Sequence, residues 1–268
     1  MDYLNRHLAP FSEETWARID AAAVNAARED LTARRFLDVD GPYGVGLTAL
    51  ELGAEDFCRQ PEPDEAGAVI SSTRALPVPM IRKAFKLSMR RIVAAEELGA
   101  PLDLTPAEEA GQAVAAREEE FMYAGSKASG LEGLLGITGG AKVRAGDWKG
   151  AGKVLSDMLK AVAALEKNGF LGPYALAVPP KQYNQLFHRY EGSDVLQLEH
   201  LKSLCEKGVY KAEIDKPVLV DPNVGHIVVG QDLRCGFSGT DGIHYQLFAN
   251  ESVVLKVEEP GAVCVLGG

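Results

Sequence analysis

The side chains that most often perform chemistry in proteins are present, but their spacing matches no common catalytic or metal-binding pattern. The five histidines include no pair at the i, i+4 spacing of a helical zinc site. Neither a Gly-x-Ser-x-Gly nucleophile elbow nor a phosphate loop of the Gly-x4-Gly-Lys form occurs. Cys58, Cys205, Cys235 and Cys264 are scattered, which indicates reduced thiols in a cytosolic protein. We therefore predict no catalytic residue and no metal site.

Composition restricts the partners of the chain. Its 268 residues can bury a large core, and no apolar run is long enough to span a membrane. The N-terminus lacks the apolar stretch of a signal peptide, so we expect a cytoplasmic protein. A net charge of −10 opposes general nucleic-acid binding, which needs basic patches.

Three segments carry clear helix signals. Ser12 can cap a helix that begins with Glu13 and Glu14. Thr105 and Glu108 form a predicted capping box at the start of a second helix, with proline at its first position. A third helix is predicted from near Asp147 to the stop signal Asn168-Gly169. The apolar face of the first helix consists of Trp16, Ile19, Ala23 and Ala26.

Strand patterns occupy much of the rest of the chain. Alternation over residues 80–91 predicts a strand with one solvated face. Further strands are predicted at residues 174–178, 218–220, 227–229, 245–248, 253–257 and 263–266, and short helices at 181–190 and 195–207. Residues 45–78 look irregular, although a structureless loop of that length is uncommon inside a compact domain. The predicted class is α+β.

Several motifs, taken in order, resemble one family from the first residue to the last. They are Met1-Asp2-Tyr3-Leu4, Leu8-Ala9-Pro10, Trp16, Arg34-Arg35-Phe36, Asp38-Val39-Asp40-Gly41-Pro42-Tyr43-Gly44, the stretch from Gly125 to Leu135, Gly172-Pro173-Tyr174 and Gly230-Gln231-Asp232-Leu233. Each motif is weak alone, but the ordered set resembles the encapsulins, more narrowly the family 1, linocin-M18-like shell proteins. These proteins have the HK97 phage capsid-like fold.

The resemblance implies a peripheral domain, an axial domain and an extended E-loop. Residues 1–44 would form the N-terminal helix and the start of the peripheral domain, and 45–79 the E-loop lying across a neighbouring subunit. Residues 80–135 would complete the peripheral domain with its spine helix, 136–222 would form the axial domain, and 223–268 would be return strands shared by both. Residues 67–71 would supply one strand of the E-loop.

The resemblance also implies two sites. A groove for the C-terminal targeting peptide of a cargo enzyme would use Leu31, Arg34, Phe36, Asp38, Asp232 and Leu233. Apolar walls and a polar contact that fixes register suit a short peptide. The alternative is that Arg34 and Asp38 merely pair with each other on the surface. A five-fold pore would be lined by Tyr190, Glu191, Gly192, Ser193 and Asp194, whose acids favour cations.

One position departs from relatives that bind a flavin. Some encapsulins stack a flavin on a tryptophan in the strand that corresponds to residues 80–91. Arg90 stands at the matching position here. Because the aromatic platform is missing, we predict no cofactor.

The resemblance thus predicts a non-enzymatic shell subunit that assembles with itself, most simply as 60 copies, although larger shells use the same fold. It would enclose a ferritin-like protein or a dye-decolourising peroxidase, in iron handling or oxidative stress. One alternative is a phage or prophage capsid protein; those usually begin with a scaffolding region, for which the N-terminal segment here leaves no room. The other is a bacteriocin- or protease-like enzyme, which no nucleophile–base set supports.

Overall fold

The structure is a computed structural model that describes residues 3–52, 74–146, 148, 152–189 and 194–267. Its α-helices are α1 (Glu13–Asp30), α2 (Met89–Leu98), α3 (Thr105–Ala124), α4 (Lys153–Lys167), α5 (Pro180–Gln185) and α6 (Gln197–Leu204). Its strands are β1 (Asp38–Asp40), β2 (Ala49–Leu52), β3 (Arg74–Pro77), β4 (Met80–Ser88), β5 (Ala141–Val143), β6 (Ala175–Val178), β7 (Val209–Lys211), β8 (Val218–Val220), β9 (Gly225–Asp241), β10 (His244–Val257) and β11 (Val263–Leu266). Helices and strands are mixed along the chain, as the predicted α+β class requires.

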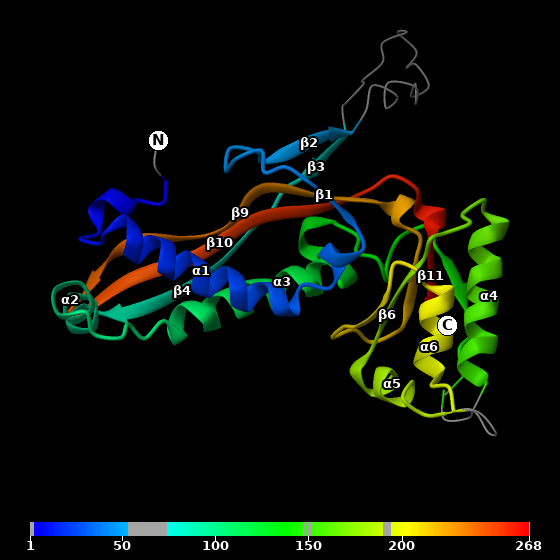
Figure 1. The fold of residues 1–268 in the computed structure, drawn as a ribbon. Helices are drawn as coiled ribbons and strands as arrows, with labels where there is room; N and C mark the ends of the chain where they lie inside the picture. Colours follow the sequence, from blue (N-terminus) through cyan, green and yellow to red (C-terminus); the bar gives the residue numbers. More distant parts are fainter. Residues whose placement is uncertain (1–2, 53–73, 147, 149–151, 190–193, 268) are drawn as a thin grey trace, which may run out of the picture.

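The elements form two parts joined by the long strands β9 and β10 (Figure 1). One part is a four-stranded sheet in the order β1-β9-β10-β4, with α1 and α3 along it and α2 at its far end. The other is a five-stranded sheet in the order β5-β11-β8-β6-β7, beside which lie α4, α5 and α6. The strands β2 and β3 pair only with each other and extend away from both parts.

Helix α1 forms as predicted and lies on α3. The Ser12 hydroxyl accepts a hydrogen bond from the Thr15 backbone N–H at 3.1 Å, which caps the helix. Trp16, Ile19 and Ala23 are buried in a core shared with α3 and the four-stranded sheet, while Ala27 rather than Ala26 continues the buried face. At the crossing, Gly111 of α3 lies against the Ala23 backbone. A Cβ atom added to Gly111 would lie 2.1 Å from the Ala23 carbonyl oxygen.

Two predicted helix starts were wrong. Helix α3 has Leu104 at its N-cap, and the side chain that supports the first turn is Asp103, which accepts from the Thr105 N–H at 3.1 Å. The capping box therefore does not form, since Thr105 itself is already helical. Helix α4 begins at Lys153, later than the predicted start near Asp147, which lies outside the described residues. Its end is as predicted, with Gly169 at a positive φ of 91°.

Two predicted strand limits were also wrong. Strand β4 stops at Ser88, and Arg90 belongs to the first turn of α2 rather than to the strand. Strand β10 is one continuous element, although residues 249–252 break its apolar pattern. Two of the three register shifts between β9 and β10 lie at this polar stretch, and the Ser252 hydroxyl accepts from the Gln231 N–H at 2.8 Å.

The segment predicted to be an extended arm contains a two-stranded sheet at its base. β2 pairs with β3 in antiparallel register, with Leu50 opposite Leu76. Both leucines are partly buried against the core that joins the two parts, so the base of the arm is anchored. The strand predicted at residues 67–71 lies outside the described residues.

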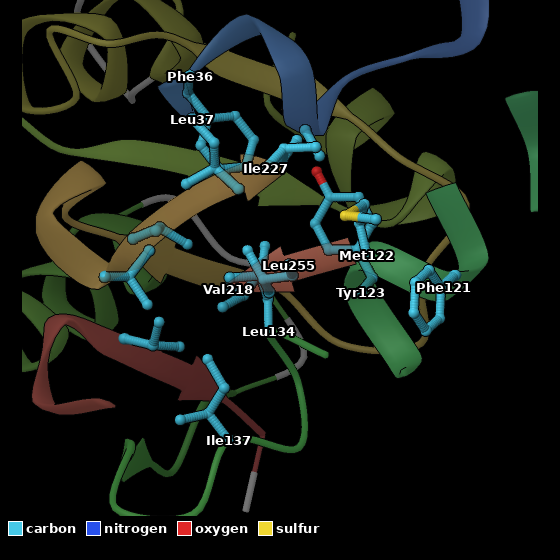
Figure 2. Close-up of a cluster of buried hydrophobic side chains, with 14 of the residues drawn as sticks. Phe36, Leu37, Phe121, Met122, Tyr123, Leu134, Ile137, Val218, Ile227 and Leu255 are labelled. Atoms are coloured by element: carbon cyan, nitrogen blue, oxygen red, sulfur yellow. The ribbon is translucent and has the colours of Figure 1, made fainter. Parts of the chain in front are cut away.

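A buried apolar cluster holds the two parts of the molecule together. Figure 2 shows side chains from the segment after α1, the end of α3, and strands β8, β9 and β10 converging on one another. Leu255 lies at its centre beside Val218 and Leu134. Strands β9 and β10 thus contribute to the cores on both sides of the junction.

Gly111 provides a test of the α1–α3 contact. We expect Gly111→Ala to destabilise the protein by about 1–3 kcal/mol, because the new methyl group must push the two backbones apart. Helix propensity alone would favour alanine by about 1 kcal/mol. Thermal and denaturant unfolding would measure the difference, with the exposed neighbour Gln112→Ala as control. A Gly111→Ala protein as stable as the Gln112→Ala protein would show that the contact is loose.

Candidate functional site

Arg34 is the centre of a network of ion pairs that joins four elements. It lies in the single turn Ala33–Arg35 that follows α1. Its Nε and one terminal nitrogen donate to both oxygens of Glu118 on α3, at 2.6 and 2.8 Å. The same terminal nitrogen lies 3.1 Å from Glu251 Oε2 on β10, and the other lies 3.2 Å from Asp232 Oδ1 on β9. The bidentate geometry at Glu118 is the arrangement for which a guanidinium is best suited.

The network is buried on one side and open on the other. The side chains of Glu118 and Glu251 are 0% and 1% exposed, whereas that of Asp232 is 60% exposed. Glu251 Oε1 is buried and has no hydrogen-bond partner. Burial, and then the neighbouring Glu118 carboxylate, raise the pKa of Glu251 well above its usual 4.5. Burial opposes the charge on Arg34, but the hydrogen bond to Glu118 and the surrounding carboxylates raise the pKa of Arg34.

A cavity of about 290 Å³ opens beside this network, between the end of α1 and strands β9 and β10. Its apolar lining comes from Val24, Ala27, Leu31 and Leu233, and its charged lining from Arg28, Arg34, Arg35, Asp232 and Glu251. The structure thus brings four of the predicted docking residues, Leu31, Arg34, Asp232 and Leu233, to one cavity. A small pocket with apolar walls and a few fixed polar groups can hold a side chain or a short extended segment.

The other two predicted docking residues lie elsewhere. Phe36 is buried in the cluster at the junction of the two parts, where its ring is 5.6 Å from that of Tyr210. Asp38 is exposed at the start of β1 and does not line the cavity. The suggested alternative, a surface pair between Arg34 and Asp38, does not form: Arg34 bonds to Glu118, Asp232 and Glu251 instead.

Sequence reasoning missed three residues that shape the site. Glu118 and Glu251 hold Arg34 in place, and Arg35 closes the end of α1 by donating to three backbone carbonyls. Glu251 gave a signal, since a charged residue within an otherwise apolar strand needs a buried partner. Glu118 is the first of three consecutive glutamates on α3, and nothing in the sequence separates it from Glu119 and Glu120.

Only one residue of the predicted pore loop is described by the structure. Asp194 is exposed, and its carboxylate lies 3.3 Å from the Arg189 guanidinium. Tyr190, Glu191, Gly192 and Ser193 lie outside the described residues. The loop joins α5 and α6, which are shorter than the predicted helices.

The described cysteines are buried free thiols. Burial raises the pKa of Cys205 and of Cys235 to about 12, and that of Cys264 to about 11. Thiols with these pKa values are poor nucleophiles at neutral pH. Among the described residues, no three His, Cys, Asp or Glu side chains gather in a way that could hold a metal ion. In the same part of the chain, no helix is both long and apolar enough to cross a membrane.

Comparisons with known proteins show the family to which the chain belongs. The model of the Linocin_M18 family, described as the encapsulating protein for peroxidase, matches residues 1–254. The type 1 encapsulin shell protein EncA of Myxococcus xanthus is 30% identical, over 100% of this chain and 97% of its own length. The chain belongs to the encapsulin shell protein family. A diheme-cytochrome–encapsulin shell fusion protein of Kuenenia stuttgartiensis is 28% identical over 95% of the chain and 73% of its own length.

Solved structures confirm the capsid-like fold of this encapsulin. The virus-like particle of Pyrococcus furiosus matches with a TM-score of 0.73 at 22% identity, covering 94% of this chain and 99% of that one. The capsid protein of the myovirus XM1 matches with a TM-score of 0.57 at 15% identity, covering 88% and 91%. The predicted HK97-like fold is therefore correct.

The raised pKa of Glu251 gives a test of the network by pH. Because folded Glu251 keeps its proton at pH values where the unfolded chain has lost it, stability falls as pH rises from 4.5 through the folded pKa. Glu251→Gln removes this titration, and its carboxamide can still accept from Arg34. We therefore expect the melting temperature of Glu251→Gln, relative to wild type, to rise with pH between 5 and 8. Glu120→Gln, at an exposed site on α3, is the control. Parallel curves for wild type and Glu251→Gln would contradict the assignment.

Proposed function

We propose that this encapsulin is the shell subunit of an icosahedral compartment that encloses a cargo enzyme, and that the cavity beside Arg34 receives the cargo's C-terminal targeting peptide. The observation that carries the proposal is the cavity itself, on a chain that belongs throughout to the shell protein family. Sixty copies are the simplest closed shell, and the cytoplasm is its location. The shell protein itself performs no reaction.

The cavity suits the end of a peptide for physical reasons. Its apolar walls lie on α1 and β9, and the Arg34 network fixes the position of the charged groups between them. A site held by buried ion pairs needs little rearrangement when it binds, which lowers the entropic cost of docking. Asp232 lies at the exposed edge of the network and is well placed to meet a polar group of the peptide. Phe36 and Asp38 do not line the groove proposed here.

The family suggests the class of cargo. Its description names a peroxidase, and one relative, from Pyrococcus furiosus, is a ferritin-like–encapsulin fusion protein that is 25% identical over 75% of this chain and 56% of its own length. We therefore propose a ferritin-like protein or a dye-decolourising peroxidase as cargo, in iron storage or oxidative stress. In the same shell, residues 190–194 would line the five-fold pore. The four-stranded part would be the peripheral domain, the five-stranded part the axial domain, and β2 and β3 the base of the E-loop.

The first prediction concerns assembly. Purified protein should elute as a megadalton particle and appear by negative-stain microscopy as closed shells of uniform diameter. Deleting residues 54–66, beyond the β2–β3 base, should give small oligomers or aggregate, because the arm would no longer reach a neighbour. A stable monomer of the intact chain at micromolar concentration would contradict the proposed shell.

The second prediction concerns docking. Arg34 is unsuitable for this test, since its removal would leave two buried carboxylates without a cation and cost roughly 3–5 kcal/mol. Asp232→Lys changes the cavity at its exposed edge and leaves the buried contacts of Arg34 with Glu118 and Glu251 in place. We expect Asp232→Lys shells of normal size that load much less cargo.

Asp38→Lys is the matched control, because it makes the same charge change outside the cavity. The measurement is the ratio of cargo to shell in particles purified after co-expression with a candidate peroxidase or ferritin-like protein, with and without its C-terminal segment. Normal cargo loading by Asp232→Lys together with loss of cargo in Asp38→Lys would show that the docking groove lies on the β1 side of the molecule.

A further inference from the structure

One cavity of the four-stranded part contains a buried polar atom that lacks a partner. The cavity has a volume of about 300 Å³ and shares no lining residue with the cavity beside Arg34. Asn250 of β10 lines it; this residue is 1% exposed, and its buried Oδ1 atom accepts no hydrogen bond from the described part of the chain. Leaving a buried carbonyl oxygen unpaired is costly. The atom therefore points to a bound group that donates a hydrogen bond to it.

The Arg82 guanidinium lines the same cavity. Arg82 stands directly opposite Asn250 in the ladder of β4 and β10, so their side chains are neighbours on one face of the sheet (Figure 1). It donates to the Ser238 hydroxyl at 3.1 Å, but no carboxylate of the described residues forms an ion pair with it. On the other side of Asn250, Arg234 of β9 stands in register with it. Two cations thus flank the amide, and the cavity favours an anion.

The apolar wall of the cavity is held in place by close packing. The Phe248 ring lies against Gly236 of β9, where an added Cβ atom would be 2.3 Å from the Cζ atom of the ring. The Arg82 guanidinium lies 4.0 Å from the centre of the same ring, a cation–π contact that orients the cation. Phe237 follows in β9, and its N–H donates to the Leu4 carbonyl at 2.8 Å, which ties the N-terminal segment to the sheet beside the cavity. An apolar group can therefore pack beside the polar pair.

We propose that this cavity binds a small hydroxy acid with an apolar remainder. The carboxylate of the ligand accepts from the Arg82 guanidinium, and the hydroxyl beside the carboxylate donates to Asn250 Oδ1. The apolar remainder lies against Met80, Phe237 and Phe248. A hydroxyl fits better than an ammonium group, because the two arginines that flank the amide repel a further positive charge. The site is independent of the proposed shell function.

Three related probes test the chemistry of the site. Phenyllactate carries the carboxylate, the adjacent hydroxyl and an apolar ring, and calorimetric titration of the purified protein should show that it binds saturably. Phenylpropanoate lacks only the hydroxyl, and we expect it to bind about tenfold more weakly, because Asn250 Oδ1 would again be unpaired. The methyl ester of phenyllactate keeps the hydroxyl but has no charge. It should bind more weakly than phenyllactate by about tenfold or more, because the charge-assisted hydrogen bonds to Arg82 are lost.

Two variants test the residues. Arg82→Gln should weaken the binding of phenyllactate by about tenfold or more, since the cation that holds the carboxylate is gone. Lys83→Gln is the matched control, because Lys83 is the next residue of β4, is exposed and does not line the cavity. Asn250→Leu is close in size to asparagine but accepts no hydrogen bond. Because this position is buried, the readout for Asn250→Leu is the ratio of the affinities for phenyllactate and phenylpropanoate, which should fall to about one.

Circular dichroism establishes that each variant is folded before it is titrated. If Asn250→Leu does not fold, the comparison of the three probes on the wild-type protein and the Arg82→Gln titration still decide the matter. Wild-type protein that does not bind phenyllactate saturably, or that binds phenyllactate and phenylpropanoate equally well, would overturn the proposal. Unchanged affinity in Arg82→Gln, or an equal loss in Arg82→Gln and Lys83→Gln, would overturn it as well.

Discussion

One guanidinium holds four elements of the four-stranded part in register. Arg34 follows α1, Glu118 lies in the middle of α3, and Asp232 and Glu251 lie on the paired strands β9 and β10. Two of the three carboxyl side chains are almost fully buried, so Arg34 must be in place to satisfy them when these elements pack. Removing the arginine alone would be costly, because it would leave buried carboxyl groups without a partner. Replacing the whole network by apolar side chains could be neutral for stability. The network therefore contributes more to fixing one arrangement of the four elements than to the free energy of unfolding. Arg34, Asp232 and Glu251 also line the cavity, so the network fixes the position of its charged groups.

The sequence predicted most elements whose signals are local. The Ser12 cap, the apolar stripe of α1, the glycine that ends α4 and the buried strand β6 each depend on residues close in the chain. The errors occurred where distant residues decide the outcome. Strand β10 was predicted as two pieces because Asn250, Glu251 and Ser252 look like a loop. Their polar groups are accommodated by bulges and by partners on β9 and after α1, which periodicity cannot reveal.

In the candidate site, too, the errors occurred where distant residues decide the position of a side chain. Arg34, Asp232 and Leu233 were chosen through family resemblance, and they do line one cavity. The two roles predicted for Arg34, a contact with the peptide or a pair with Asp38, did not allow for Glu118 and Glu251, which approach it from segments more than 80 residues away. Phe36 was chosen through the same resemblance, but the turn that follows α1 directs its side chain into the core of the junction.

The length of strands β9 and β10 makes the shape of this shell protein sensitive to small bends. At about 3.3 Å per residue, the 17 residues of β9 span roughly 55 Å, from the junction core to the tip near α2. The bulges near Asn250 and Ser252 lie part-way along this lever, beside the Arg34 network. A bend of a few degrees at such a point displaces the far tip by about 1–2 Å. The position of this tip relative to the junction core thus depends on a few polar residues far from the tip.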